Sequence, residues 1–175
     1  MSEAMNITRP RREEQPFRGV RIVLTCSAPM DVVVASLRAR MGRLSTAAVI
    51  DLSRKAVSVE AFESVTRSVI PESGFVIFDE IDHGAWLQRY GLSLKSLRWI
   101  FGNPLIAETI IRYDATAGLF VPLELLFTEL PHGKGCSITY VIPSSLIAID
   151  DNAPLAAAAK RLDSKLEALM AFVPG

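Results

Sequence analysis

A histidine in an acidic stretch is the first place where this 175-residue sequence suggests chemistry. His83 follows Asp79, Glu80 and Asp82, and a histidine beside carboxylates is typical of an acid–base pair or of part of a metal site. However, neighbouring positions of a strand point to opposite faces, so Asp82 and His83 need not touch. The only other histidine, His132, lies in a predicted loop, and zinc needs three or four ligands. The sequence therefore predicts no metal site and no cofactor.

The segment Gly102-Asn103-Pro104 is the clearest local signal in the chain. Asparagine is a good N-cap and proline is preferred at the first helical position, so a helix is predicted to begin here. Free backbone N–H groups at such a helix start can also hold an anion. Arg98 precedes the segment and Arg112 follows it by about two helical turns. A structural cap and an anion site are both open interpretations.

The chain is mostly apolar, and a small number of polar side chains fall near the predicted ends of its helices and strands. Such a combination is typical of small-molecule sites. The candidate ligand-binding residues are His83, Trp86, Asn103, Arg112, Asp114 and Tyr140. We expect a non-enzymatic, cytoplasmic domain that binds a small, partly apolar ligand between a sheet and its helices. One alternative is an enzyme that uses His83 with Asp82 or Asp114 as an acid–base pair. Another is a homo-oligomeric structural or interaction module without a ligand.

The elements that must position these residues follow from hydrophobic periodicity. Strands are predicted at 19–28, 75–78, 94–101, 121–130 and 136–142. Helices are predicted from about 30 to 41, 58 to 69, 104 to 113 and 153 to 173. Residues 43–57 are read as a loop or a short strand. The last helix carries an apolar stripe that packs on the sheet or on a second subunit.

This order of elements predicts an α+β fold. We expect a two-layer sandwich, with a mostly antiparallel sheet of about five strands and helices packed on one face. Residues 18–175 are expected to form a single domain, and residues 1–17 a disordered or loosely attached arm.

Composition excludes several classes of protein. Nineteen basic side chains balance nineteen acidic ones, and half of the residues are hydrophobic, which argues against a dedicated nucleic-acid binder and against a disordered chain. No run approaches the roughly 18 apolar residues of a membrane span, and two cysteines make no disulfide framework. Residues 1–60 carry a net charge of +4 and residues 61–175 carry −4. This asymmetry favours attraction between the two parts, or between neighbouring copies.

Three short motifs resemble a prokaryotic family, the domain of unknown function DUF302. They are Ile81-Asp82-His83 at the end of a strand, Gly102-Asn103-Pro104 at the start of a helix, and Val121-Pro122 at the start of the next strand. The resemblance covers about residues 58–150. It implies a compact α+β domain of the kind that forms homodimers, with no assigned reaction and hence no catalytic residues to carry over.

Overall fold

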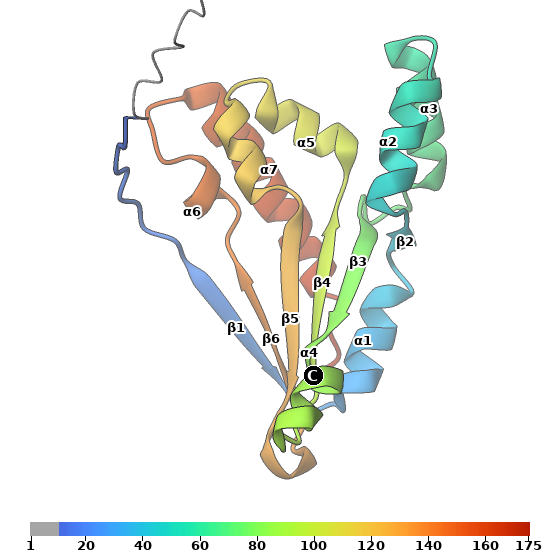
Figure 1. Ribbon diagram of the computed structural model, residues 1–175, viewed down its shortest axis with the longest axis vertical. Helices are drawn as coiled ribbons and strands as arrows, with labels where there is room; N and C mark the ends of the chain where they lie inside the picture. The colour runs from blue at the N-terminus through green and yellow to red at the C-terminus, as the bar shows by residue number, and fades with distance from the viewer. Residues whose placement is uncertain (1–10) are drawn as a thin grey trace, which may run out of the picture.

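Six strands form one sheet in the computed structural model, which describes residues 11–175 (Figure 1). The strands are β1 (Arg21–Cys26), β2 (Gly42–Arg43), β3 (Val76–Asp82), β4 (Ser96–Gly102), β5 (Leu123–Glu129) and β6 (Cys136–Val141). Their order across the sheet is β1-β6-β5-β4-β3-β2, and every neighbouring pair is antiparallel except the parallel pair β2–β3. The expected α+β class with a mostly antiparallel sheet is confirmed. The sixth strand, β2, is too short for its alternation to show in the sequence.

Helices cover one face of this sheet and carry most of the remaining core. The α-helices are α1 (Met30–Arg38), α2 (Thr46–Lys55), α3 (Val59–Val69), α4 (His83–Leu87), α5 (Pro104–Ile111), α6 (Ser144–Ile147) and α7 (Ala153–Met170). The 3-10 segments are η1 (Gln88–Tyr90), η2 (Ala115–Phe120) and η3 (Pro131–Gly133). The apolar stripe of α7 is buried in the chain's own core, through Leu155, Ala159, Leu162, Leu166 and Leu169. The stripe is therefore used within the molecule and not by a second subunit.

Alternation along the central strands separates a covered face from an open one. Trp99 and Phe101 of β4, Leu125 and Phe127 of β5 and Ile138 of β6 are fully buried toward α1, α5 and α7. The residues between them point to the opposite face. Within the described part of the chain, no long helix packs over that second face, and only short segments stand at its ends (Figure 1).

Two of the predicted helix starts are confirmed by their caps. The Asn103 side chain accepts a hydrogen bond from the backbone N–H of Leu105 at 2.8 Å, with Pro104 at the first helical position of α5. The Asn152 side chain accepts one from Leu155 at 3.0 Å and begins α7. Each cap satisfies N–H groups that have no partner inside the helix.

The prediction for residues 43–57 is wrong over most of its length, because Thr46–Lys55 is the helix α2. Ser45 caps it by accepting from the N–H of Ala48 at 3.2 Å. This helix has no buried residue, and its run of Ala and β-branched residues is compatible with a short strand as well as with a helix. Figure 1 shows α2 and α3 together, standing away from the sheet at one corner.

The predicted arm over residues 1–17 lies partly outside the described residues. Residues 11–17 are exposed and have no regular secondary structure, although the ring of Phe17 packs edge-on against Phe120 with centroids 5.9 Å apart. In residues 11–175, no helix combines the length and the apolar character that a membrane crossing requires.

Candidate functional site

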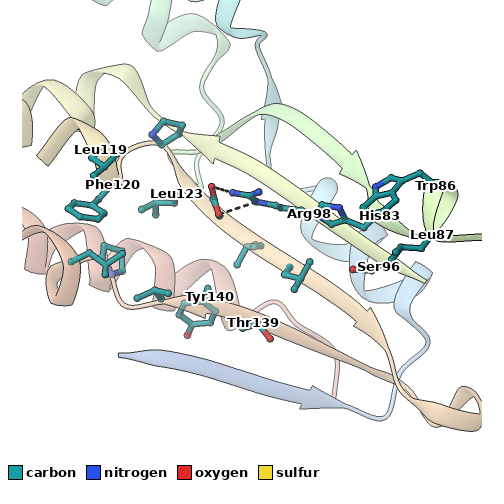
Figure 2. A pocket seen from close by; sticks show the side chains of 17 residues that line it. His83, Trp86, Leu87, Ser96, Arg98, Leu119, Phe120, Leu123, Thr139 and Tyr140 are labelled. Atoms are coloured by element: carbon teal, nitrogen blue, oxygen red, sulfur yellow. Dashed lines mark hydrogen bonds and ion pairs between the residues drawn. The ribbon is translucent and has the colours of Figure 1, made fainter. Parts of the chain in front are cut away.

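The open face of the sheet is hollowed into a groove of about 600 Å³. Strands β4, β5 and β6 form its floor, α4 stands at one end, and η2 and α6 stand at the other (Figure 2). Its walls are mostly apolar, and their main side chains are Trp86, Leu87, Leu119, Phe120, Pro143 and Leu146. A volume of this size is in the range of small-molecule sites.

The first end of the groove is positioned by the start of α4. Asp82 ends β3 and caps α4, since its side chain accepts from the N–H of Ala85 at 3.0 Å. Gly84 lets the helix lie close to the start of β4, because a Cβ there would lie 2.4 Å from the carbonyl oxygen of Leu94 and 3.3 Å from the backbone nitrogen of Ser96. This close approach directs His83 and Trp86 into the groove (Figure 2).

Three aromatic rings follow one another along α4 and η1. The His83 and Trp86 rings meet edge-on with centroids 6.1 Å apart, and Trp86 and Tyr90 do so at 6.3 Å. Half of the Trp86 side chain is exposed. This end of the groove therefore offers an aromatic surface with the imidazole of His83 as its polar part.

The floor of the groove holds one ion pair. The guanidinium of Arg98 on β4 donates through Nε to Glu124 Oε2 at 3.0 Å, and through Nη2 to the second carboxylate oxygen (Figure 2). Arg98 lies opposite Leu126, and Ile100 lies opposite Glu124, so the pair is diagonal across two antiparallel strands. Both partners are partly accessible, and this fork-on-fork geometry is the one with which arginine binds carboxylates.

Asn103 lies outside this groove, in a second cavity of about 200 Å³. That cavity lies between the sheet and α2, α5 and α7, and its other walls are almost entirely apolar. The Asn103 amide is already engaged, because its oxygen caps α5 and its nitrogen donates to the carbonyl of Gly74 at 2.9 Å. In the structure, Asn103 therefore stabilises the fold by holding the start of α5 against Gly74.

Arg112 and Asp114 line neither cavity. Arg112 pairs with Glu108 one turn earlier on α5, at 2.7 Å. Asp114 caps η2 by accepting from the N–H and the hydroxyl of Thr116 at 2.8 and 2.7 Å, and these bonds lower the pKa of the Asp114 carboxyl. Both side chains are therefore engaged with neighbouring residues on the surface.

Tyr140 borders the groove through its strand, β6. Residues two apart on a strand share a face, so its side chain points to the helix-covered face together with the buried Ile138. Burial, with the charge of Glu167 on α7 as a smaller cause, raises the pKa of the Tyr140 hydroxyl. Of the six predicted residues, His83 and Trp86 thus present their side chains to one groove, and Tyr140 contributes part of its strand.

The acid–base alternative has no geometric support in the described residues. The Asp82 carboxylate caps α4 and the Asp114 carboxylate caps η2, and neither bonds to His83. Residues 11–175 also contain no group of three or more His, Cys, Asp or Glu side chains placed to hold a metal ion.

Sequence reasoning missed the partner of Arg98 and the far wall of the groove. Alternation along residues 94–101 already places Arg98 opposite to the buried Trp99. Glu124, Leu119 and Phe120 come from later in the chain, and only the β4–β5 register brings them near. That register is not visible in a single sequence.

A family model described as "Domain of unknown function DUF302" matches residues 50–173. The chain belongs to this family. The DUF302 region contains β3 to β6, both ends of the groove and the Arg98–Glu124 pair, whereas β1, α1 and β2 precede it. The resemblance carried by the three short motifs is confirmed.

A solved structure shows the same fold. The crystal structure of an uncharacterized conserved DUF302 protein from Bacillus stearothermophilus superposes with a TM-score of 0.60 at 17% sequence identity. The match covers 87% of this chain and 97% of that protein. Among curated proteins, none matches this chain. At such low identity, the structural likeness establishes the DUF302 fold and nothing about a ligand.

Proposed function

We propose that this DUF302 domain binds a small, partly apolar ligand that carries one acidic group, in the groove on the open face of its sheet. The observation that supports this most directly is the combination of a mostly apolar hollow of about 600 Å³ with one accessible arginine in its floor. The site differs from the expected one, because it faces away from the layer formed by α1, α5 and α7.

The apolar walls of the groove determine which kind of apolar group the ligand carries. Trp86 and Leu87 at one end and Leu119 and Phe120 at the other leave a floor with one ion pair between them. Covering an exposed apolar side chain contributes about 25 cal/mol for each Å² removed from water. Flat aromatic or short aliphatic groups suit such walls, since edge-on and stacked contacts with Trp86 are available.

The arginine in the floor of the groove is the partner for the acidic group of the ligand. Glu124 is more exposed than Arg98, at 52% against 35% of the side chain. A ligand carboxylate or sulfonate can therefore take the place of Glu124 on the guanidinium while Glu124 turns toward water. Arginine provides the planar fork that this exchange needs, which lysine does not.

The probe for this proposal is 8-anilino-1-naphthalenesulfonate, which combines fused rings with one sulfonate. We expect saturable binding to the folded chain, with Trp86→Ala and Arg98→Gln each weakening it about tenfold or more, since each removes a contact worth on the order of 1–2 kcal/mol. Fluorescence titration measures the affinity, and competition by a metabolite panel then ranks natural ligands.

Two matched variants control this experiment. Tyr113→Ala removes a partly exposed ring that follows α5, away from the aromatic end of the groove, and Arg112→Gln removes a surface arginine paired on α5. Both residues lie outside the groove lining, so both variants should bind like the parent chain. Equal weakening by the control and groove variants would show that the probe binds elsewhere, and the proposal would be abandoned.

We also propose that the protein works in the cytoplasm. Cys26 and Cys136 lie opposite each other in the β1–β6 register, and both are free and buried. Free thiols in this arrangement suit a reducing compartment.

A further inference from the structure

We infer that a cleft between α3, α5 and α7 binds a phosphate monoester with a small apolar body, such as an aryl or short alkyl phosphate. This goes beyond the proposed function, because it assigns a second site that is built by helices and not by the open sheet face. The cleft has a volume of about 440 Å³ and shares no lining residue with the groove. The two sites can therefore be tested separately.

Three helices form the walls of this cleft. Helix α5 packs against both α3 and α7, and Figure 1 shows it between them. The start of α5 borders the cleft but offers no free donor there. The N–H groups of Leu105 and Ile106 are bonded to the Asn103 side chain at 2.8 and 3.4 Å. Charged side chains, and not the helix start, are therefore the groups that can hold an anion.

The charged side chains of the cleft are all basic. Arg67 comes from α3, and Arg161 and Lys165 come from α7. The last two are four residues apart, so they share one face of the helix. Among the described residues, no carboxylate lines the cleft. The cleft is thus cationic, although the chain as a whole carries no net charge.

Two of these cations have no counter-charge within residues 11–175. Arg67 pairs with Glu63 on its own helix at 2.8 Å. Neither Arg161 nor Lys165 takes part in an ion pair of the described chain. Like charges four residues apart on a helix repel each other, so an anion held between them relieves an unfavourable interaction.

The charge and the number of acceptors favour a phosphate monoester over a carboxylate. At neutral pH, such a phosphate carries about −1.5 to −2 charges and three strong acceptor oxygens. This matches the two unpaired cations on α7 and offers a third oxygen to Arg67. Arginine binds phosphate oxygens through its planar fork, and lysine binds them as a point charge. A nucleic acid needs a longer basic surface, and the balanced composition of the chain argues against one.

The rest of the cleft determines what the phosphate is attached to. Ala158 and Leu162 are buried, and Ile70, Leu105 and Ile106 are half-buried around them. An inorganic phosphate would leave these apolar walls in water, whereas an aryl or short alkyl group covers them. The volume lies toward the lower end of the range of small-molecule sites. The body of the ligand is therefore small.

Phenyl phosphate is the probe for this site, and phenyl sulfate is its singly charged counterpart. We expect saturable binding of phenyl phosphate in calorimetric titrations above the second phosphate pKa of about 6. Inorganic phosphate and phenyl sulfate should each bind about tenfold more weakly. Arg161→Gln and Lys165→Gln should each lower the affinity for phenyl phosphate about tenfold, since each removes a charge-assisted hydrogen bond.

Three further variants make this test specific. Lys160→Gln is the matched control, because it removes the same charge from the same helix. Lys160 pairs with Asp163 at 3.3 Å and does not line the cleft. At about 0.15 M salt, charges more than about 8 Å apart are screened, so this variant should bind like the parent. Arg161→Lys keeps the charge without the fork and should weaken binding less than Arg161→Gln. Arg98→Gln removes the arginine of the groove and should leave the affinity of the cleft unchanged.

Each outcome supports or overturns the inference. A parent chain without saturable binding overturns it, and so does binding that is lost in Arg98→Gln, because the probe then occupies the groove. An equal loss in Lys160→Gln and Arg161→Gln indicates general attraction of anions and no site. Equal affinities for phenyl phosphate and phenyl sulfate overturn the match to a doubly charged group. Equal affinities for phenyl phosphate and inorganic phosphate overturn the apolar body.

Discussion

Glu80 accepts hydrogen bonds from three side chains, more than any other carboxylate in residues 11–175. Its carboxylate accepts from Arg38 and Arg43 and from the indole nitrogen of Trp99, the last at 2.9 Å, and the side chain is only 16% exposed. Burial raises the pKa of Glu80, but the bond from Arg43, the charge and bond of Arg38 and the bond from Trp99 together outweigh it, so the net pKa is lowered. The ionised form therefore stabilises the fold.

We expect Glu80→Gln to lower the free energy of unfolding by about 1–3 kcal/mol at neutral pH, since it leaves two arginines without their counter-charge. The sign with pH follows from the lowered pKa. The stabilisation is complete above the unfolded carboxyl's value of about 4.5 and is lost as the pH falls through the lower folded value. Urea unfolding at several pH values should show the parent and the variant converging in acid.

Glu63→Gln is the matched control for this prediction. Glu63 pairs with Arg67 on the exposed surface of α3 at 2.8 Å, and such pairs contribute about 0.3–0.5 kcal/mol. A loss at Glu63 as large as that at Glu80, or a Glu80→Gln difference that persists unchanged to low pH, would contradict the role given to Glu80.

The two thiols provide a second prediction at the residue scale. Burial raises the pKa of Cys136 to about 11, with the neighbouring Cys26 adding to the effect. Both thiols are buried, so at pH 8 the native chain should react with iodoacetamide only through opening of the fold. The raised pKa of Cys136 further disfavours its thiolate, which is the nucleophile. Mass spectrometry should find no label on the folded protein when Ser64→Cys, an exposed position on α3, is already labelled. If Cys26 or Cys136 were labelled in the folded protein as fast as the cysteine introduced on α3, the burial of both thiols would be contradicted.

At the scale of elements, α4 is the segment that depends most on one small residue. Gly84→Ala introduces a Cβ 2.4 Å from the backbone oxygen of Leu94, which must push α4 away from β4. We expect a loss of about 1–3 kcal/mol in stability and a weaker affinity for the naphthalenesulfonate probe, because Trp86 moves with the helix.

Gly118→Ala is the control on the opposite wall of the groove. A Cβ there would meet Ile111 at 3.7 Å, which is an ordinary contact. This variant should retain the stability and the probe affinity of the parent. A Gly84→Ala variant that behaves in the same way would show that the close approach of α4 to β4 does not position Trp86.

The elements also show how far sequence reasoning reaches. Strand β6 and helices α5 and α7 are predictable, because each pairs a periodic apolar pattern with turn or cap residues such as Asn103 and Asn152. Helix α2 is not, since it buries no side chain completely and its run of Ala and β-branched residues fits a strand equally well. An apolar run that fits both a helical and a strand period cannot be assigned from the sequence alone.

At the scale of the molecule, the fold class follows from the order of elements, but the site does not. His83 and Trp86 are found because they lie next to each other on one short helix. Asn103, Arg112 and Asp114 are polar residues near helix ends. In the structure, Asn103 and Asp114 cap those ends, and Arg112 pairs with Glu108 on the surface. Glu124 and the far wall enter only through strand pairing, which depends on the whole sheet.

The position of β1 has a consequence for how the chain reaches this fold. Strands β3 to β6 follow one another in sequence and in the sheet, so they can pair as they are made. Strand β1 pairs with β6 at the far edge, and the Val20 amide donates to Ser145, 125 positions along the chain. Contacts at such separation close a long loop and form late. During synthesis, β1 must wait for β6, the last of the six strands, and its apolar residues stay exposed until then.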